Sequence, residues 1–167
     1  MTRELKRKIL DLFEGPTLSE LATITRHGRP WVRYVMSSID DEMTLRIPTR
    51  SDARKVRDIN FCPDVHVLVG KNLFSSSGAY AQIEGFAVIT ADPRKREKEW
   101  SEAMKRFFTG PRDPDYVLIE VRPYRIEYWS AMEKENPQVL DTDDFIYSFG
   151  PGDERPIADS EPTPAFV

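Results

Sequence analysis

The chain has 167 residues, enough for one domain, and its 40% hydrophobic and 31% charged residues are ordinary for a globular protein. With 24 Lys and Arg against 28 Asp and Glu, the formal net charge of −4 gives no overall attraction to nucleic acid. The single cysteine, Cys62, excludes an internal disulfide and a zinc site built from several cysteines. No apolar run suited to a signal peptide or a membrane span follows the charged N-terminus, so we expect a cytoplasmic protein that binds no membrane.

The first half of the chain alternates between helical and strand patterns. Apolar residues at positions 5, 9, 12 and 13 have the spacing of an amphipathic helix, which the Gly-Pro pair at 15–16 ends. Strands are expected at residues 21–25, 30–39 and 43–47, separated by turn-forming residues. Residues 51–60 predict a second helix, which carries several basic side chains.

The second half continues with strands at 64–69 and 80–90, separated by a polar loop at 71–78. Gly85 indicates a bulge or a close approach of two backbones. A third helix is expected at 92–108 and two more strands at 116–121 and 125–129. Six or seven short strands with three helices predict a mainly β fold, an antiparallel barrel with peripheral helices. We assign residues 1–132 to this domain and residues 133–167 to an acidic, proline-containing, irregular tail.

Arg33 is the first candidate for a functional charge, because it alternates with Trp31 and Val35 along one strand face. If that face points inward, the guanidinium needs an anionic partner, since an unpaired buried charge is very unfavourable. If it points outward, Arg33 is simply solvated. Alternation alone does not say which face is buried.

Arg54 and Lys55 open the second predicted helix, shortly after a strand that ends at Pro48-Thr49. A helix N-terminus favours anions, Thr49 offers a hydroxyl, and the fork of Arg54 fits a phosphate. The alternative is a solvated basic helix face.

Trp129 ends the last predicted strand, where it either stacks on a ligand ring or packs in the core or a dimer contact. Tyr80 and Gln82 share one strand face, and either side chain can hydrogen-bond the edge of a heteroaromatic ring. His27 and His66 have no metal-ligand spacing, so we expect no metal site, and we identify no catalytic residue.

In their order along the chain, these segments resemble the FMN-binding split-barrel flavoproteins, the superfamily of pyridoxamine 5'-phosphate oxidase, and within it the general stress protein 26 group. The resemblance spans residues 5–130. It is carried by Leu21-Ala22-Thr23-Ile24, Gly28-Arg29-Pro30, Arg54-Lys55-Val56-Arg57-Asp58-Ile59, Ile83-Glu84-Gly85-Phe86 and Pro123-Tyr124-Arg125-Ile126-Glu127-Tyr128-Trp129.

The resemblance implies a Greek-key-like antiparallel split β-barrel that binds FMN at the interface of a homodimer. It also implies which residues hold the phosphate and the ring: Arg33, Tyr34, Val35, Met36, Ser37, Pro48, Thr49, Arg54 and Lys55. Tyr80 or Gln82, together with Trp129, would complete the site, with one of them coming from the partner subunit.

The chain departs from the family pattern at three places. Ala53 replaces a serine that supplies a phosphate hydroxyl, and Cys62-Pro63 replaces an Asn-Pro. After Trp129 the chain reads Ser130-Ala131-Met132-Glu133 instead of the Arg-x-His with which true vitamin B6 oxidases hold their substrate. Vitamin B6 oxidation is therefore not expected.

The function expected on these grounds is a small FMN-dependent oxidoreductase whose substrate and electron donor the sequence does not identify. One alternative keeps the fold and binds the deazaflavin F420 or haem, with Arg26, Arg29 and Arg50 as further cations for the F420 tail. Another is a flavin-binding stress or sensor module without catalysis, or a cofactor-free dimer that binds protein partners.

Overall fold

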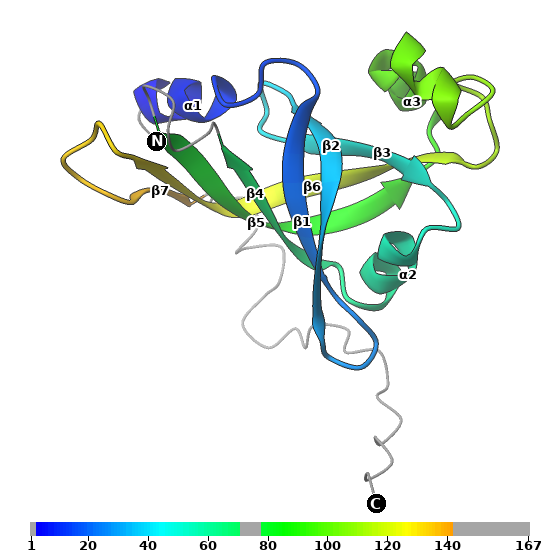
Figure 1. Ribbon diagram of the computed structural model, residues 1–167, viewed down its shortest axis with the longest axis horizontal. Coiled ribbons are helices and arrows are strands. Elements are labelled where there is room, and N and C mark those ends of the chain that lie inside the picture. The colour runs from blue at the N-terminus through cyan, green and yellow to red at the C-terminus, as the bar shows by residue number, and fades with distance from the viewer. Residues whose placement is uncertain (1–2, 71–77, 142–167) are drawn as a thin grey trace, which may run out of the picture.

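The computed structural model describes residues 3–70 and 78–141, whose strands pair in one antiparallel sheet that closes on itself (Figure 1). The strands are β1 (Thr17–Ile24), β2 (Pro30–Ile39), β3 (Leu45–Arg50), β4 (Asp64–Gly70), β5 (Ala79–Thr90), β6 (Tyr116–Ser130) and β7 (Gln138–Asp141). They lie in the order β3-β2-β1-β4-β5-β6-β7, and pairing of β3 with β6 closes the barrel. The predicted antiparallel barrel is confirmed.

The barrel interior is filled from alternate positions of each strand, because successive side chains point to opposite faces. β4, for example, buries Val65, Val67 and Val69, while the residues between them face outward. The helix α1 (Arg3–Leu10) adds Leu5 and Ile9 to the same core and covers one end of the barrel (Figure 1).

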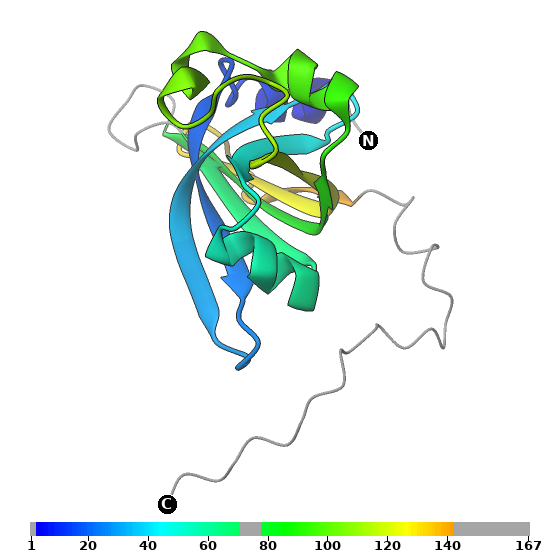
Figure 2. The same ribbon diagram turned by 90° about the vertical axis from the view of Figure 1, so that its right-hand side faces the viewer.

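Two helices connect strands across the ends of the barrel. The helix α2 (Arg54–Phe61) joins β3 to β4, which are not neighbours in the sheet, so it must pass from one side of the barrel to the other. It lies beside the β1–β2 hairpin in both views (Figures 1 and 2). The helix α3 (Pro93–Glu99) follows β5 and is capped by Asp92, which accepts hydrogen bonds from the backbone of Arg94 and Lys95.

Gly85 confirms the predicted close approach of two backbones. The pairing of β5 with β6 shifts its register between Glu84 and Gly85, and a Cβ at Gly85 would lie 2.6 Å from Cγ1 of Val121. β6 runs through this irregularity as one strand, whereas two strands at 116–121 and 125–129 were expected. Pro123 lies at the bulge, where the absence of its N–H does not end the pairing.

The helix expected at 92–108 is divided in two. α3 ends at Glu99, Trp100 and Ser101 are extended, and a 3₁₀ helix, η1 (Glu102–Arg106), follows. The apolar residues that suggested one helix, Trp100, Met104 and Phe108, instead pack around Tyr116 and Leu118 in a second small core. Packing of large side chains therefore overrides their helical spacing.

The predicted irregular tail contains one strand. β7 pairs with β6 and buries Leu140 opposite Ile126, so part of the segment after residue 133 belongs to the sheet. The rest of the tail, residues 142–167, and most of the expected polar loop, residues 71–77, lie outside the described residues. Within the described ranges, no helix is long and apolar enough to cross a membrane.

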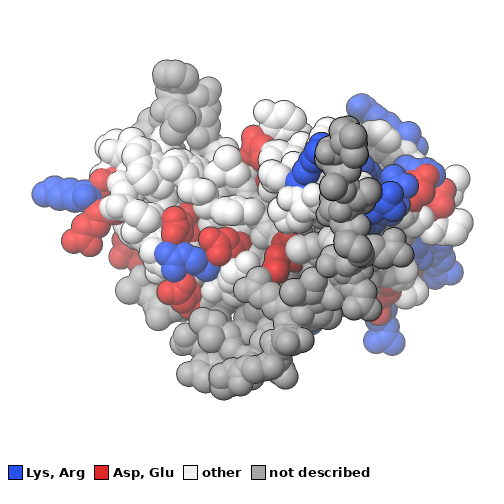
Figure 3. All heavy atoms as spheres, turned by 90° about the horizontal axis from the view of Figure 1, so that it is seen from below, with Lys and Arg blue, Asp and Glu red and all other residues white. Residues whose placement is uncertain are grey.

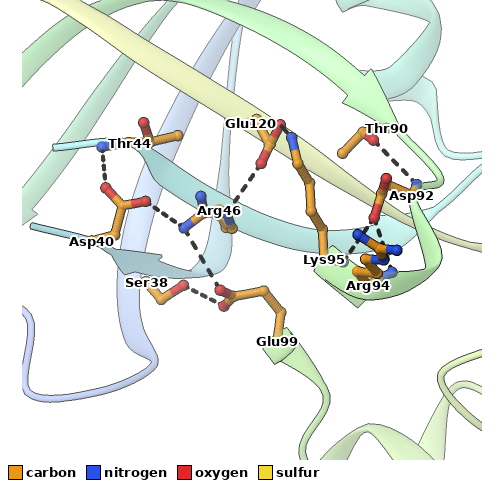
Figure 4. A network of polar contacts seen from close by, with 10 residues as sticks. All are labelled: Ser38, Asp40, Thr44, Arg46, Thr90, Asp92, Arg94, Lys95, Glu99 and Glu120. Carbon is orange, nitrogen blue, oxygen red and sulfur yellow. Dashed lines mark hydrogen bonds and ion pairs between the residues drawn. The ribbon is translucent and has the colours of Figure 1, made fainter. Parts of the chain in front are cut away.

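A network of charges fastens α3 to the barrel (Figure 4). Arg46 of β3 contacts Asp40 at 2.7 Å and the buried Glu120 of β6 at 3.1 Å. Glu120 also contacts Lys95 of α3 at 2.6 Å, and Glu99 at the end of α3 accepts a 2.7 Å hydrogen bond from Ser38. In this network, which we call the Arg46 network, every charged group has a partner of opposite sign.

Candidate functional site

The inward orientation of Arg33 decides between the two sequence-based alternatives. Its guanidinium donates to Oγ1 of Thr23 at 2.7 Å and lies 3.2 Å from Oδ2 of Asp58, a residue of α2. Thr23 in turn donates to the same carboxylate oxygen at 2.9 Å. The Arg33 side chain is only 17% exposed, so the anionic partner that an inward arginine requires comes from α2 of this chain.

Arg54, the first residue of α2, lies over an aromatic ring. Its guanidinium carbon is 3.9 Å from the ring centroid of Trp31, which belongs to β2. The residue before the helix, Ala53, has an extended backbone and provides no side-chain cap. The start of α2 therefore combines an uncapped N-terminus with an exposed arginine.

Lys55 is half-buried beside these two arginines. Burial lowers the pKa of its amino group, and the positive charge of Arg33 lowers this pKa further. Burial also lowers the pKa of Arg33, an effect that the Asp58 carboxylate opposes and the Arg54 charge strengthens. Within the described part of the chain, Lys55 makes no hydrogen bond or ion pair. We call Arg33, Arg54 and Lys55, with Asp58 beneath them, the α2 cation cluster.

The cluster has more positive than negative charge, because Asp58 neutralises one cation only. Desolvated cations that depress the pKa of one another are stabilised by an anion placed between them. Figure 3 views the molecule from the side of α2 and the tip of the β1–β2 hairpin. More Lys and Arg side chains are seen in its right half, the side on which α2 lies, than in its left half. The arrangement is therefore suited to an anionic ligand.

Thr49 and Pro48 precede the cluster at the end of β3. Thr49 points inward and is buried, whereas Pro48 is half-buried on the other side of the strand. The next residue, Arg50, contacts Asp52 at 3.0 Å and Asp115 at 2.9 Å. Arg50 thus has carboxylate partners, whereas Arg54 and Lys55 have none among the residues that the structure describes.

The remaining candidates on β2 divide between the two faces of the sheet. Val35 and Ser37 are buried inside, and Oγ of Ser37 lies 2.6 Å from Oγ of Ser19. Tyr34 and Met36 point outward and are exposed. The structure therefore places only Arg33 of this segment in the cation cluster.

Tyr80 and Trp129 lie directly opposite each other on β5 and β6, with ring centroids 5.4 Å apart and planes inclined by 23°. Both are on the outer face of the barrel, as is Gln82, which lies between Leu68 and Glu127. Of the two alternatives, Tyr80 is the one that stacks on Trp129. These residues and the α2 cation cluster lie on opposite faces of the sheet.

The same outer face carries a group of exposed apolar side chains on β1, β2 and β4. We call this group the outer apolar patch; it consists of Leu18, Val32, Tyr34, Met36 and Leu68. The strand register places Leu18 opposite Met36 and Glu20 opposite both Tyr34 and Leu68. The members are thus neighbours on one surface.

Sequence reasoning missed Asp58, Thr23 and Trp31. A signal was available for Asp58, because an inward Arg33 requires an acid and α2 offers one on its buried side. Trp31 shares the strand face of Arg33, but its contact with Arg54 depends on where α2 packs. No group of three or more His, Cys, Asp or Glu residues within the described ranges could hold a metal ion.

Comparisons with known proteins agree with the fold. The family model described as pyridoxamine 5'-phosphate oxidase matches residues 5–130. General stress protein 26 of Bacillus subtilis (strain 168) is 33% identical over 132 residues, which cover 79% of this chain and 93% of that protein. The crystal structure of general stress protein 26 from Bacillus anthracis has a TM-score of 0.71 at 32% identity, over 83% of this chain and 99% of that one.

Two further solved structures have names that mention cofactors. An F420 reductase has a TM-score of 0.56 at 27% identity, over 70% of this chain and 93% of that one. A pyridoxamine 5'-phosphate oxidase-related, FMN binding protein from Nostoc punctiforme has a TM-score of 0.66 at 15% identity, over 84% and 88%, which shows a shared fold. Because the family match runs from α1 to the end of β6, this chain belongs to the pyridoxamine 5'-phosphate oxidase family.

Proposed function

We propose that this protein binds FMN and acts as a small flavin-dependent oxidoreductase. The observation that carries the proposal is the α2 cation cluster, in which Lys55 is half-buried beside two arginines and has no carboxylate partner among the described residues. A phosphate is the anion that such a cluster at a helix start fits best. A bound flavin supplies hydride and electron transfer, while the protein binds and orients it.

The roles within the site follow from the contacts. Arg54 presents N–H donors, Lys55 presents a flexible ammonium group, and Arg33 adds charge from a fixed position. Thr49, at the end of β3, offers a hydroxyl near the start of α2. Tyr80 and Trp129 provide a stacked aromatic surface for the flavin ring.

We further propose that the protein is a homodimer. The cation cluster and the Tyr80–Trp129 pair lie on opposite faces of the sheet, so one flavin contacts both only if a second copy provides the aromatic pair. The outer apolar patch supports this arrangement, since Tyr34 is 68% exposed and Leu18 57%. An interface of identical subunits would cover it in both copies.

The substrate is not vitamin B6 in this proposal. The segment after Trp129 forms a turn in which Asn136 donates to the carbonyls of Ser130 and Glu133 at 2.8 Å and 3.1 Å. It contains no Arg-x-His.

F420 is the second candidate cofactor, supported by the likeness to an F420 reductase. F420 has an anionic tail, which needs further cations beside the phosphate site. Arg50 is already paired with two carboxylates, whereas Arg29 is exposed at the hairpin turn. Parallel titrations with FMN and F420 separate the two cofactors.

The test of the phosphate assignment is the double variant Arg54→Ala, Lys55→Ala. We expect it to lose about 2–4 kcal/mol of FMN binding free energy, or about 30- to 1,000-fold in affinity, because charge-assisted contacts are removed. Riboflavin, which has no phosphate, is the matched control ligand and should lose little. Unchanged FMN affinity in a folded double variant would refute the assignment.

Two further measurements test catalysis and assembly. Oxidation of NADH or NADPH by the FMN-loaded protein supports an enzyme, whereas bound flavin without turnover by any donor supports a sensor.

Tyr34→Asp with Met36→Glu should convert a dimer to monomers in analytical ultracentrifugation. Val88→Asp, which changes an exposed apolar position on β5 outside the patch, should not. A monomeric wild-type protein would contradict the dimer.

A further inference from the structure

Trp31 combines a large ring with an exposed position. It is 46% exposed, although it lies on the same strand face as the inward Arg33 and opposite the buried Thr23. It belongs to neither of the two buried core clusters. Its described contact is the guanidinium of Arg54, 3.9 Å above the ring.

The cations of the α2 cluster are restrained in different ways. Arg33 is fixed by hydrogen bonds that it donates to Asp58 and Thr23. Arg54 is restrained by Trp31, over whose ring its guanidinium carbon lies. Lys55 has no such restraint in the described part of the chain.

The kind of restraint decides how many N–H donors and how much charge of an arginine remain available to a ligand. A carboxylate partner would neutralise Arg54 and occupy its donors, as Asp52 and Asp115 do for Arg50. An aromatic face holds the guanidinium plane while the N–H groups at its edge stay free and the full charge is kept. A ring is therefore the partner that orders an arginine without weakening it as an anion ligand.

We propose that Trp31 is a positioning residue for phosphate binding, which holds the guanidinium of Arg54 at the α2 cation cluster without touching the phosphate itself. This inference rests on the proposed FMN-binding function and adds to it a residue on the β1–β2 hairpin. The hairpin becomes part of the phosphate site because Trp31 lies on it. The ring favours binding because an Arg54 that is already ordered loses less rotamer freedom when the ligand binds.

The experiment is a double-mutant cycle of Trp31→Leu and Arg54→Ala, read with FMN and with riboflavin. An exposed cation–π contact corresponds to about a two- to fivefold change in affinity, so Trp31→Leu should weaken FMN binding by that factor and leave riboflavin unchanged. In the Arg54→Ala background, Trp31→Leu should have no further effect, because its partner is gone. Trp31→Phe should restore part of the affinity.

Arg50→Ala is the matched control, since it removes an exposed arginine that is paired with carboxylates. It should leave FMN affinity at the wild-type value. The melting temperature of Trp31→Leu, measured without ligand, should fall by a few degrees at most, because the ring is not in the core and only an exposed cation–π contact is lost.

Several results would overturn the role of Trp31. An equal loss of riboflavin binding would mean that the ring contacts the flavin. Additive effects in the cycle would mean that Trp31 acts independently of Arg54. Unchanged FMN affinity in Trp31→Leu would mean that Trp31 has no role in binding. Wild-type protein that binds FMN no better than riboflavin overturns the proposed function and this inference together. A wild-type preference for FMN with an additive cycle overturns the inference alone.

Discussion

The α2 cation cluster and the Arg46 network place the same kinds of residues in similar surroundings, yet they differ in how completely their cations are paired with carboxylates. Arg46 is 14% exposed and Arg33 is 17% exposed, so both arginines require partners. Around Arg46, the carboxylates of Asp40, Glu99 and Glu120 surround the guanidinium, and Lys95 neutralises Glu120 from the other side. That network is complete within the protein and fastens α3 to β3 and β6.

The α2 cation cluster, by contrast, lacks carboxylate partners for two of its three cations among the described residues. Asp58 balances Arg33, but Arg54 is held by a ring and Lys55 has no partner in the described residues. In the Arg46 network, loss of one partner would leave a buried charge unpaired, whereas in the α2 cation cluster the unpaired, desolvated cation lowers stability until an anion binds. The difference therefore separates a structural group of charges from a ligand site within one small barrel.

The largest effect is expected from breaking the Arg46 network. Arg46→Met removes the cation that contacts Asp40 and leaves Glu120, which is only 5% exposed, with Lys95 alone. Breaking a buried ion pair in this way costs about 3–5 kcal/mol. Urea denaturation should show this loss in the free energy of unfolding, while the folded fraction binds FMN with wild-type affinity. A variant as stable as wild type would mean that the Arg46 network is not what fastens α3.

A smaller effect, with two opposite signs, is expected from Lys55→Met. Without ligand the variant should be at least as stable as wild type, because a desolvated and unpaired charge is replaced by an apolar side chain of similar length. With FMN it should lose about 1.5–3 kcal/mol of binding free energy, the value of a hydrogen bond to a charged group. Thermal melting without ligand and an FMN titration measure the two effects.

The result for Lys55→Met sharpens the comparison only if the signs differ. A variant that loses both stability and FMN affinity would show that Lys55 has a structural role. Lys95→Met is the matched control, since this lysine is paired with Glu120 in the Arg46 network. It should lose stability and keep FMN affinity.

The sequence predicted the barrel well, because the information is local. Val65, Val67 and Val69 alternate along one strand, and Gly85 marks a place where any side chain would clash with Val121. The division of residues 92–108 could not be predicted, since Trp100 and Phe108 have helical spacing and leave it only to pack on Tyr116. β7 was missed because it has only four residues and lies in an acidic, proline-containing segment, although it pairs with the preceding strand β6.

The candidate site was predicted only in part, for a related reason. Arg33, Arg54 and Lys55 are indeed brought together, but alternation does not reveal which strand face is buried. The partners that give each cation its role, Asp58 and Trp31, depend on how α2 crosses from β3 to β4. The division of residues 34–37 between two faces follows from the strand itself, and it could have been expected once the strand was assigned.

The smallest predicted effect is a pH dependence that belongs to Lys55 alone. Its pKa is lowered from 10.5 in the folded protein, mainly by burial and also by Arg33. Below the lowered pKa the lysine is charged in both states, and its burial lowers stability. As the pH rises through the lowered pKa, the folded protein releases this proton while the unfolded chain keeps it up to 10.5, so the free energy of unfolding rises. Comparing wild type with Lys55→Met removes the contributions of all other groups, provided that the two proteins share the same fold.

The sign reverses when phosphate binds, and this reversal distinguishes the two kinds of charge group. An anion beside Lys55 raises its pKa, so FMN binding takes up a proton and FMN affinity falls as the pH rises through the same range. Titrations from neutral pH to about pH 10 should show this fall in wild type and a weaker one in Lys55→Met. An identical pH profile in both proteins would show that the lysine keeps its proton without help from the ligand. Lys55 would then be a solvated surface charge, and the contrast with the Arg46 network would rest on Arg54 and Trp31 alone.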